Sequence, residues 1–223
     1  MTVGTGQQLS LTSIDDYLGP SETRFFSRGY QRAGYQVRDV VVTPADAPDA
    51  GVRATVDVTY PADWSRKKDG TDLRPHLSTV DALVLGVQLA ELHLAHGYGL
   101  DGAARTRMRL RKVVLRAGGA PQEELTDIPL AARLVRTEEL PGPSARHLSV
   151  HDCTVGNLRV RCEIEHDIAT RTVEEARHES LEKALGPGTE RFWGEGFKNR
   201  RHFIRDVRVD LDARTFRVGD TVV

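Results

Sequence analysis

A segment of about thirty residues occurs twice in this chain of 223 residues. Residues 13–42 align without a gap on residues 180–209, at a constant offset of 167 positions, and 11 of the 30 aligned pairs are identical. The shared stretches include Leu-Gly-Pro and, shortly after it, Arg-Phe. Self-similarity at a fixed spacing is typical of a repeated structural unit. We therefore expect one complete unit, residues 1–179, followed by the opening of a second unit, residues 180–223.

The segment Leu77–His96 is strongly helical and ends at a glycine. Val80, Leu83, Val84, Val87 and Leu94 form one apolar stripe along it, whereas Leu85, Leu89 and Leu92 fall on the other side. A helix that is apolar almost all round must be buried on nearly every side. The sequence therefore predicts a long central helix enclosed by other elements.

Alternating β-branched and polar residues, bounded by turn signals, predict strands on both sides of this helix. Two strands precede it, at 37–43 and 52–60, and four follow it, at 108–117, 131–138, 147–153 and 158–166. A charged helix is expected next, at 173–184, and then two strands, at 203–210 and 215–222.

This order of elements describes an α+β protein with a hot-dog fold, in which an antiparallel sheet curls around a long buried helix. Residues 180–223 would supply a partial second hot-dog unit, consisting of a helix, a turn and two strands. Buried strand edges need hydrogen-bonding partners. We expect these strands to pack on the first sheet or on a partner subunit, so a homodimer is one expected arrangement.

Composition excludes several functional classes. The formal net charge is -1, so no bulk electrostatic attraction to nucleic acid or to a membrane surface is expected. The longest apolar stretch is too interrupted to span a bilayer, because it contains Asp81, Gln88 and Glu91. The chain has two cysteines without a Cys-x-x-Cys spacing, and no disulfide framework is expected. Residues 1–12 lack the pattern of a signal peptide, so we expect a cytoplasmic protein.

The sharpest functional signal lies where the central helix begins. His76 stands five residues before Asp81, and the amides after Ser78, beginning with Thr79, would form the free N-terminus of the helix. Such amides and the helix dipole stabilise an oxyanion. His76 suits the role of a general base, and Asp81 would orient it or act itself.

A structural interpretation of the same residues stays open. Ser78 and Asp81 have the spacing of a capping box, in which each side chain bonds the other residue's backbone N–H. His76 follows a proline and is equally consistent with a loop histidine bonded to a carbonyl group.

The loop before this helix is long and contains a tryptophan of the kind that is usually buried, which makes it a candidate functional loop. Its expected substrate-binding residues are Trp64, Ser65, Arg66, Lys67 and Lys68. The basic residues would grip an anionic substrate or carrier, although solvated surface cations are the alternative.

No metal site is expected. The run Cys162–Asp167 contains ligand-type residues, but successive side chains of a strand point to opposite faces. The run therefore splits into two incomplete sets.

Four segments carry a resemblance to a known family. They are FFSRGYQR at 25–32, YPADWSRKK at 60–68, RPHLSTVDALVLGVQLAE at 74–91 and RFWGEGFKNRRHFIRDV at 191–207. Together they resemble the bacterial avirulence D (AvrD) family over nearly the whole chain. The stretch Pro75–Leu92 is also similar to the HPALLDAAL motif of polyketide dehydratase domains, with the same His-to-Asp spacing.

The AvrD resemblance implies synthesis of syringolide-like acyl-sugar signals, in which a 3-oxoacyl thioester is joined to a ketose-type acceptor. This chemistry parallels that of A-factor-type butyrolactone synthases, which look like double hot-dogs. The implied partners are small-molecule substrates and an acyl donor, either coenzyme A or an acyl carrier protein, without a further cofactor. A dehydratase or thioesterase on the same fold is the first alternative, and a non-catalytic acyl-chain binding module is the second.

Overall fold

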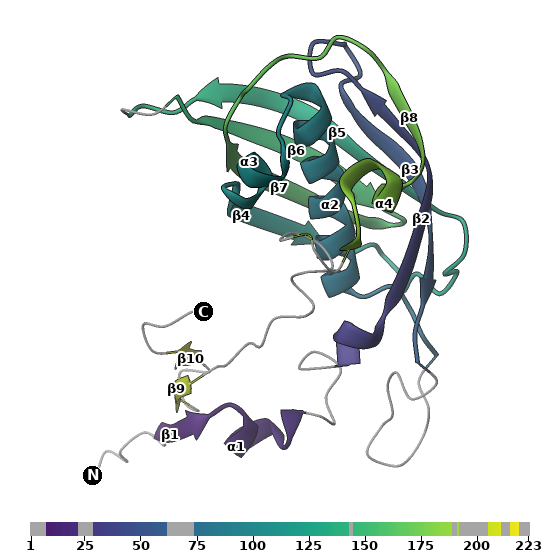
Figure 1. The fold of residues 1–223 in the computed structure, drawn as a ribbon. Coiled ribbons are helices and arrows are strands. Elements are labelled where there is room, and N and C mark those ends of the chain that lie inside the picture. Colours follow the sequence, from purple (N-terminus) through teal and green to yellow (C-terminus); the bar gives the residue numbers. More distant parts are fainter. Residues whose placement is uncertain are drawn as a thin grey trace, which may run out of the picture. The chain divides into compact units, whose positions relative to one another are not determined.

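The computed structural model of the chain describes residues 8–21, 29–61, 74–142, 145–188, 191, 205–210 and 215–218. The chain divides into two compact units (Figure 1). The larger unit is residues 32–199, and the smaller unit combines residues 1–31 with residues 200–223.

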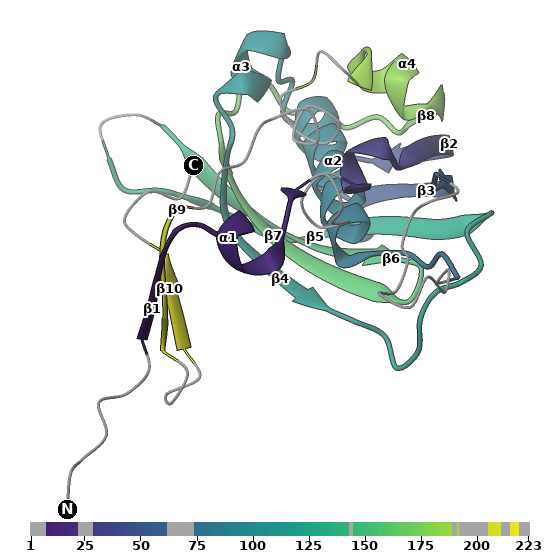
Figure 2. The same cartoon turned by 90° about the horizontal axis from the view of Figure 1, so that it is seen from below.

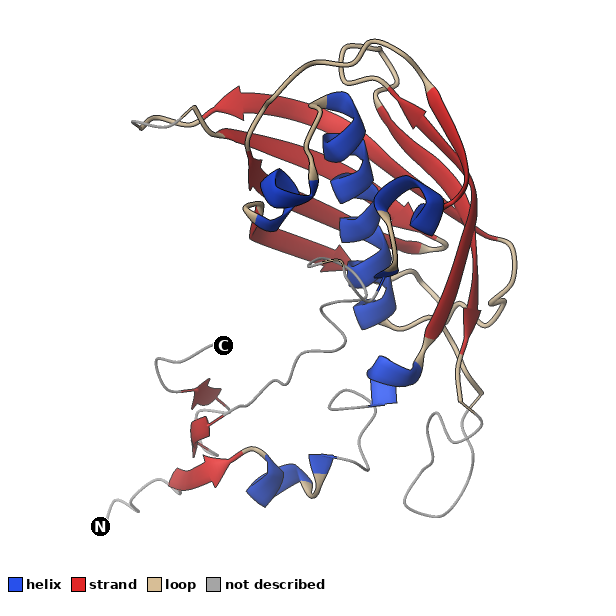
Figure 3. Ribbon diagram, in the orientation of Figure 1, coloured by secondary structure: helices blue, strands red, loops and turns tan. Residues whose placement is uncertain are grey.

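The larger unit is built on a seven-stranded antiparallel sheet (Figure 3). Its strands are β2 Gly34–Thr43, β3 Gly51–Thr59, β4 Arg109–Arg116, β5 Ile128–Glu139, β6 His147–Val155, β7 Leu158–His166 and β8 Ala176–Ser180. They lie side by side in the order β4-β7-β6-β5-β3-β2-β8. The six strands expected around the central helix are all present, with ends shifted by a few residues. The fold is thus mixed α+β and dominated by one antiparallel sheet.

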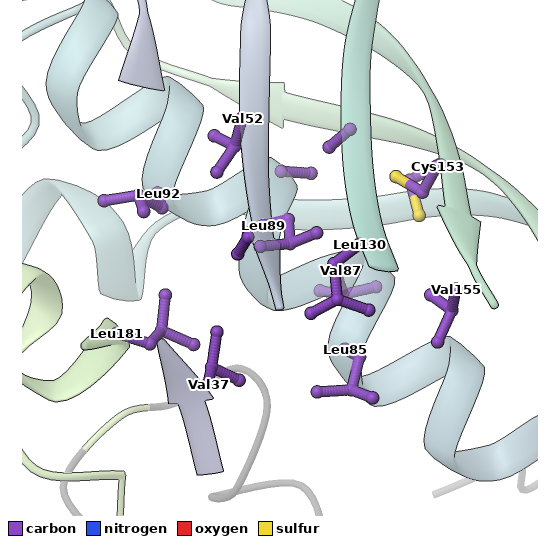
Figure 4. Packing of buried hydrophobic residues seen from close by; sticks show 14 of the residues in the cluster. Val37, Val52, Leu85, Val87, Leu89, Leu92, Leu130, Cys153, Val155 and Leu181 are labelled. Atoms are coloured by element: carbon purple, nitrogen blue, oxygen red, sulfur yellow. The ribbon is translucent and has the colours of Figure 1, made fainter. Parts of the chain in front are cut away.

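The central helix, α2, spans Thr79–Gly97 and contacts five strands of the sheet, β2, β3, β5, β6 and β7. Leu85, Leu89 and Leu94 are fully buried. Figure 4 shows side chains from several strands gathered around Leu85 and Leu89. Burying one leucine stabilises a fold by about 1.5–3 kcal/mol, so the apolar surface all round α2 holds the unit together. The expectation of a buried helix is confirmed.

Helix α2 lies close to the sheet at Gly86. A Cβ atom added there would lie 3.3 Å from Val160 Cβ and 3.4 Å from Cys153 Cβ. The Cys153 thiol also donates a hydrogen bond to the Gly86 carbonyl oxygen, at 3.5 Å. A residue without a side chain at this position lets the helix backbone rest on β6 and β7.

Two short helices lie on the same side of the sheet as α2 (Figure 2). They are α3, Gly102–Thr106, and α4, Leu181–Leu185, which contacts β8, β2 and α2. The expectation of a charged helix over 173–184 is therefore wrong. Residues 176–180 instead form β8, the edge strand that pairs with β2, and Ser180 caps α4. Pairing with β2 satisfies this segment's backbone groups, which a local sequence pattern does not reveal.

The smaller unit contains a second, three-stranded sheet in the order β1-β9-β10. Its elements are β1 Gln8–Ser13, helix α1 Asp15–Leu18, β9 Arg205–Asp210 and β10 Thr215–Val218. A 3-10 turn, Gly29–Arg32, stands at the boundary between the units. Strands β9 and β10 fall within the two strands expected at the end of the chain.

The sequence repeat is also a structural repeat in the described residues. Helices α1 and α4 both end at a glycine, Gly19 with φ 83° and Gly186 with φ 85°. The N–H of each glycine donates to the carbonyl oxygen four residues earlier. Only glycine adopts such a backbone conformation without strain. Both copies therefore follow a short helix with the same turn, and each leads on to a strand.

The repeat extends to the way the strands pair. Strand β2 pairs with β8 so that Arg38 faces Ser180, and β9 pairs with β1 so that Arg205 faces Ser13. Subtracting 167 from 205 and from 180 gives 38 and 13, so the two registers are equivalent. In each case the strand after one copy's helix pairs with the strand before the other copy's helix.

The exchange of strands brings both copies of the repeat into each of the two sheets. Strand β8, Ala176–Ser180, which leads into the helix of the second copy, belongs to the sheet of the larger unit. Strand β1, at the start of the first copy, belongs with β9 and β10.

Among the helices that the structure describes, none is long and apolar enough to cross a membrane.

Candidate functional site at the start of the buried helix

Helix α2 begins with a complete capping box. The Ser78 hydroxyl accepts a hydrogen bond from the Asp81 N–H at 3.2 Å, and an Asp81 carboxylate oxygen accepts one from the Ser78 N–H at 3.1 Å. The structural role expected for this pair is therefore confirmed. Asp81 is also fully buried, which a cap at a solvent-exposed helix end does not require.

Two tyrosines complete the surroundings of this carboxylate. The Tyr35 hydroxyl, on β2, donates a hydrogen bond to Asp81 Oδ1 at 2.5 Å, and the Tyr60 hydroxyl, directly after β3, donates one to Asp81 Oδ2. The Ser78 hydroxyl also donates to Oδ2, at 2.5 Å. With the Ser78 N–H, four donors converge on one buried carboxylate, and carboxylate oxygens offer enough lone pairs to accept them all.

The pKa of the Tyr60 hydroxyl is strongly raised in this site. Burial raises the pKa of its hydroxyl above the usual range, and the neighbouring Asp81 charge and hydrogen bond raise it further. The hydroxyl therefore stays protonated. It donates to Asp81 and accepts a hydrogen bond from the Ser78 N–H at 3.2 Å, which ties the end of β3 to the helix cap.

His76 lies two residues before the helix cap and is half-buried. Its Nδ1 atom is 3.3 Å from the Arg74 carbonyl oxygen, so Nδ1 carries the proton in this bond. This is the loop-histidine contact that the sequence left open.

Of the remaining predicted site residues, Thr79 is described by the structure and the residues of the preceding loop are not. Thr79 is the first residue of α2 and is exposed, and amides in the first turn of a helix have no acceptor within the helix. The amides of Thr79 and Val80 both lie in this first turn. Trp64, Ser65, Arg66, Lys67 and Lys68 lie outside the described residues.

Sequence reasoning missed Tyr35 and Tyr60. The two residues are far from Asp81 in the chain, and only the pairing of β2 with β3 brings them together. One signal was present, since each tyrosine stands near the end of a predicted strand on the side toward the helix start. A search for polar aromatic residues at those strand ends would have found them.

A second polar cluster lies buried between α2 and the sheet. His93 Nδ1 and His151 Nε2 are 3.0 Å apart, and the Ser149 hydroxyl donates to His166 Nε2 at 2.7 Å. Burial lowers the pKa values of His93 and His166 to about 4 and that of His151 well below its usual value. These histidines are therefore neutral residues of the core. Within the described part of the chain, no three His, Cys, Asp or Glu side chains are grouped to hold a metal.

Comparison with known protein families gives a match over most of the chain. A family model described as Pseudomonas avirulence D protein (AvrD) matches residues 9–223. No curated protein and no solved structure matches the chain.

Proposed function

Because this chain belongs to the AvrD family, we propose that it is an acyl-thioester enzyme that joins a 3-oxoacyl chain to a ketose-type acceptor. The products would be syringolide-like or butyrolactone-like signal molecules. The observation that carries the proposal is the buried Asp81, which holds two tyrosine hydroxyls at the start of α2, close in sequence to His76.

We propose that the larger unit is a hot-dog. Two strands, a long buried helix and four more strands follow one another along the chain. Five neighbouring strands of the sheet, β7, β6, β5, β3 and β2, contact the helix. The repeated strand–helix–strand element formed by β8, α4 and β9 supports a partial second hot-dog unit in residues 180–223. Strand β9 of this element pairs with β1 in the same way that β2 pairs with β8. Such an exchange is expected of two units that form a double hot-dog.

In the proposed reaction, the acceptor hydroxyl attacks the thioester carbonyl carbon. His76 takes the hydroxyl proton as the new C–O bond forms, and the amides of Thr79 and Val80 stabilise the oxyanion. The C–S bond then breaks, and His76 returns the proton to the leaving thiolate. Asp81 acts indirectly, by holding the hydroxyls of Tyr35 and Tyr60 at the wall of the site.

The same proposal assigns a binding role to the preceding loop. Trp64 and Ser65 would contact the acyl donor, and Arg66, Lys67 and Lys68 would attract an anionic substrate, the phosphates of coenzyme A or an acyl carrier protein. The thioester supplies the activated acyl group, so the proposed transfer needs no further cofactor.

Mass spectrometry of reaction mixtures distinguishes this function from its alternatives. The protein is incubated with 3-oxoacyl and 3-hydroxyacyl thioesters, each with and without a ketose. A new adduct that forms only from the 3-oxoacyl thioester and the ketose supports the proposal. Loss of water from the 3-hydroxyacyl thioester supports a dehydratase, release of free acid supports a thioesterase, and bound but unchanged thioester supports a binding module. Each of these last three results overturns the proposed transfer.

A further inference from the structure

The larger unit contains a cavity of about 150 Å³ beside the second half of α2. Its walls come from α2, from α3 and from the chain that follows α4, and they include Glu91, Arg105, Thr106, Gly186 and Arg191. Glu91 stands ten residues after Asp81 in α2, which corresponds to roughly 15 Å along the helix axis. The cavity is therefore separate from the site at the helix start.

Glu91 is an unusual residue for a helix interior. Its side chain is only 2% exposed, and its Oε1 atom is 3.8 Å from Arg105 Nη1, beyond hydrogen-bond distance. Its Oε2 atom is buried without a hydrogen-bond partner among the described residues. A buried carboxylate oxygen without a partner destabilises a fold, so this acceptor is suited to a bound ligand.

Two guanidinium groups face the same space. Arg105 of α3 donates from Nη1 to the Leu185 carbonyl oxygen at 3.1 Å, which fixes its side chain, while its buried Nε has no hydrogen-bond partner in the described part of the chain. Arg191 is 6% exposed and lines the cavity. Two cations and one carboxylate give the cavity a surplus of positive charge. Burial raises the pKa of Glu91 to about 7, against the opposing effect of both arginines.

We propose that this cavity binds a small oxyanion that carries a neighbouring hydroxyl group, of the hydroxycarboxylate or phosphomonoester type. Arg105 and Arg191 hold the oxyanion, since guanidinium groups match the geometry of carboxylate and phosphate oxygens. The Oε2 atom of Glu91 accepts a hydrogen bond from the hydroxyl group of the ligand, which satisfies the buried carboxylate. This site goes beyond the proposed acyl transfer and does not depend on it.

Isothermal titration calorimetry with simple probes tests the proposal and distinguishes the two ligand types. The probes are sulfate, inorganic phosphate, acetate, glycolate and glycerol 3-phosphate, with glycerol as the uncharged reference. We expect glycolate to bind at least about tenfold more tightly than acetate, because only glycolate offers a hydroxyl group to Glu91. A stronger response to glycerol 3-phosphate than to glycolate identifies a phosphomonoester, and the reverse identifies a hydroxycarboxylate. If no anion binds, or if glycerol binds as well as the anions, the proposal is wrong.

Substitutions of arginines inside and outside the cavity test whether anions bind there. Arg105→Gln should weaken every anion at least about tenfold, whereas Arg107→Gln should leave binding unchanged. Arg107 is a matched control, because it lies just after α3, is largely exposed and pairs with Asp167. Anion binding that survives Arg105→Gln in a folded protein refutes the site.

Glu91→Gln keeps the shape of the side chain and removes only its charge, so it serves even if Arg105→Gln fails to fold. This variant should bind sulfate as well as or better than the parent but lose the preference for glycolate over acetate. In the parent, sulfate affinity should rise as the pH falls from 8 to 6, because protonation of Glu91 removes a negative charge while Arg105 and Arg191 keep theirs. Sulfate itself does not change charge over this range. An unchanged glycolate preference, or the same pH response in Glu91→Gln, contradicts the proposal.

Discussion

At the scale of single residues, two buried carboxylates of α2 have opposite surroundings. Asp81 accepts hydrogen bonds from two tyrosines and from Ser78 and is fully satisfied. Glu91 has an oxygen without a partner among the described residues, next to a cavity. A satisfied carboxylate fixes the positions of its partners, whereas an unsatisfied one is available to a ligand. We therefore propose a positioning role for Asp81 and a binding role for Glu91.

The first prediction concerns His76. Substituting alanine should lower turnover in the proposed acyl transfer by about 10²–10⁴-fold, the usual contribution of a general base, while the urea midpoint of unfolding changes little because the ring is only half-buried. The measurement is product formation by mass spectrometry at matched folded fraction. His178→Ala, on the edge strand β8, is the control and should retain parental turnover. Parental turnover in His76→Ala would remove this residue from the mechanism.

The second prediction concerns the buried histidines. Their folded-state pKa values are depressed, to about 4 for His93 and His166 and further for His151, whereas an unfolded histidine has a pKa of about 6.5. The unfolded state therefore binds more protons between these values. Stability should be fully present above pH 6.5 and should fall as the pH drops toward 4, by up to about 1.4 kcal/mol per pH unit for each histidine.

Urea unfolding at a series of pH values measures this effect. Other groups also titrate in this range, so the comparison is between the parent and His151→Leu, which removes one buried imidazole. We expect the pH slope of the unfolding free energy to decrease by about one proton in the variant. Equal slopes in the two proteins would mean that His151 is charged or exposed in solution.

At the scale of elements, α1 and α4 are two copies of one short helix in different settings. Leu185 of α4 is 5% exposed and belongs to the core around α2, whereas its counterpart Leu18 in α1 is 52% exposed. The described residues of the smaller unit include no long helix that corresponds to α2. The same sequence pattern is therefore buried in one copy and exposed in the other.

The third prediction follows from this difference. Leu185→Ala should destabilise the protein by about 2–5 kcal/mol, since it leaves a cavity in a packed core. Leu18→Ala should change the unfolding free energy by less than about 0.5 kcal/mol, as surface substitutions usually do. Chemical denaturation of the parent and the two variants gives both values. Equal destabilisation would show that α1 is covered in solution as α4 is.

At the scale of the whole molecule, each sheet contains a strand from both copies of the repeat. Strand β8 completes the edge of the seven-stranded sheet beside β2, and β1 pairs with β9 in the three-stranded sheet. The chain from β2 to β8 folds around α2 as one unit, and the ends of the chain meet in the other. The backbone amides of the two units should therefore lose their protection from hydrogen exchange independently.

The fourth prediction tests this independence. In an antiparallel ladder, neighbouring residues point their N–H groups to opposite sides, so the double variant Ser10→Pro/Leu11→Pro removes whichever N–H of β1 faces β9. Hydrogen exchange should become faster for the amides of β9, while the amides of β5 and β6 keep their protection. If protection were lost throughout the sheet of the larger unit as well, the two units would form a single cooperative structure.

The sequence alone determined the features that depend on local chemistry. The apolar surface all round residues 77–96 specified a buried helix, because no other environment accommodates it. The Ser78–Asp81 spacing specified a capping box, since all its atoms lie within one turn. The repeat specified matching helix–turn–strand elements, because the same glycine ends the same helix in both copies.

Tertiary structure decided what depends on pairing between distant segments. Residues 173–184 carry a helical pattern, yet residues 176–180 form a strand because they pair with the edge of β2. Tyr35 and Tyr60 reach Asp81 only because β2 and β3 align beside the helix start. In the sequence, Glu91 only interrupts an apolar run. In the folded chain, Arg105 and Arg191 from later segments line a cavity together with Glu91. Hydrogen-bond and charge partners of this kind are separated by tens of residues, so local periodicity carries no information about them.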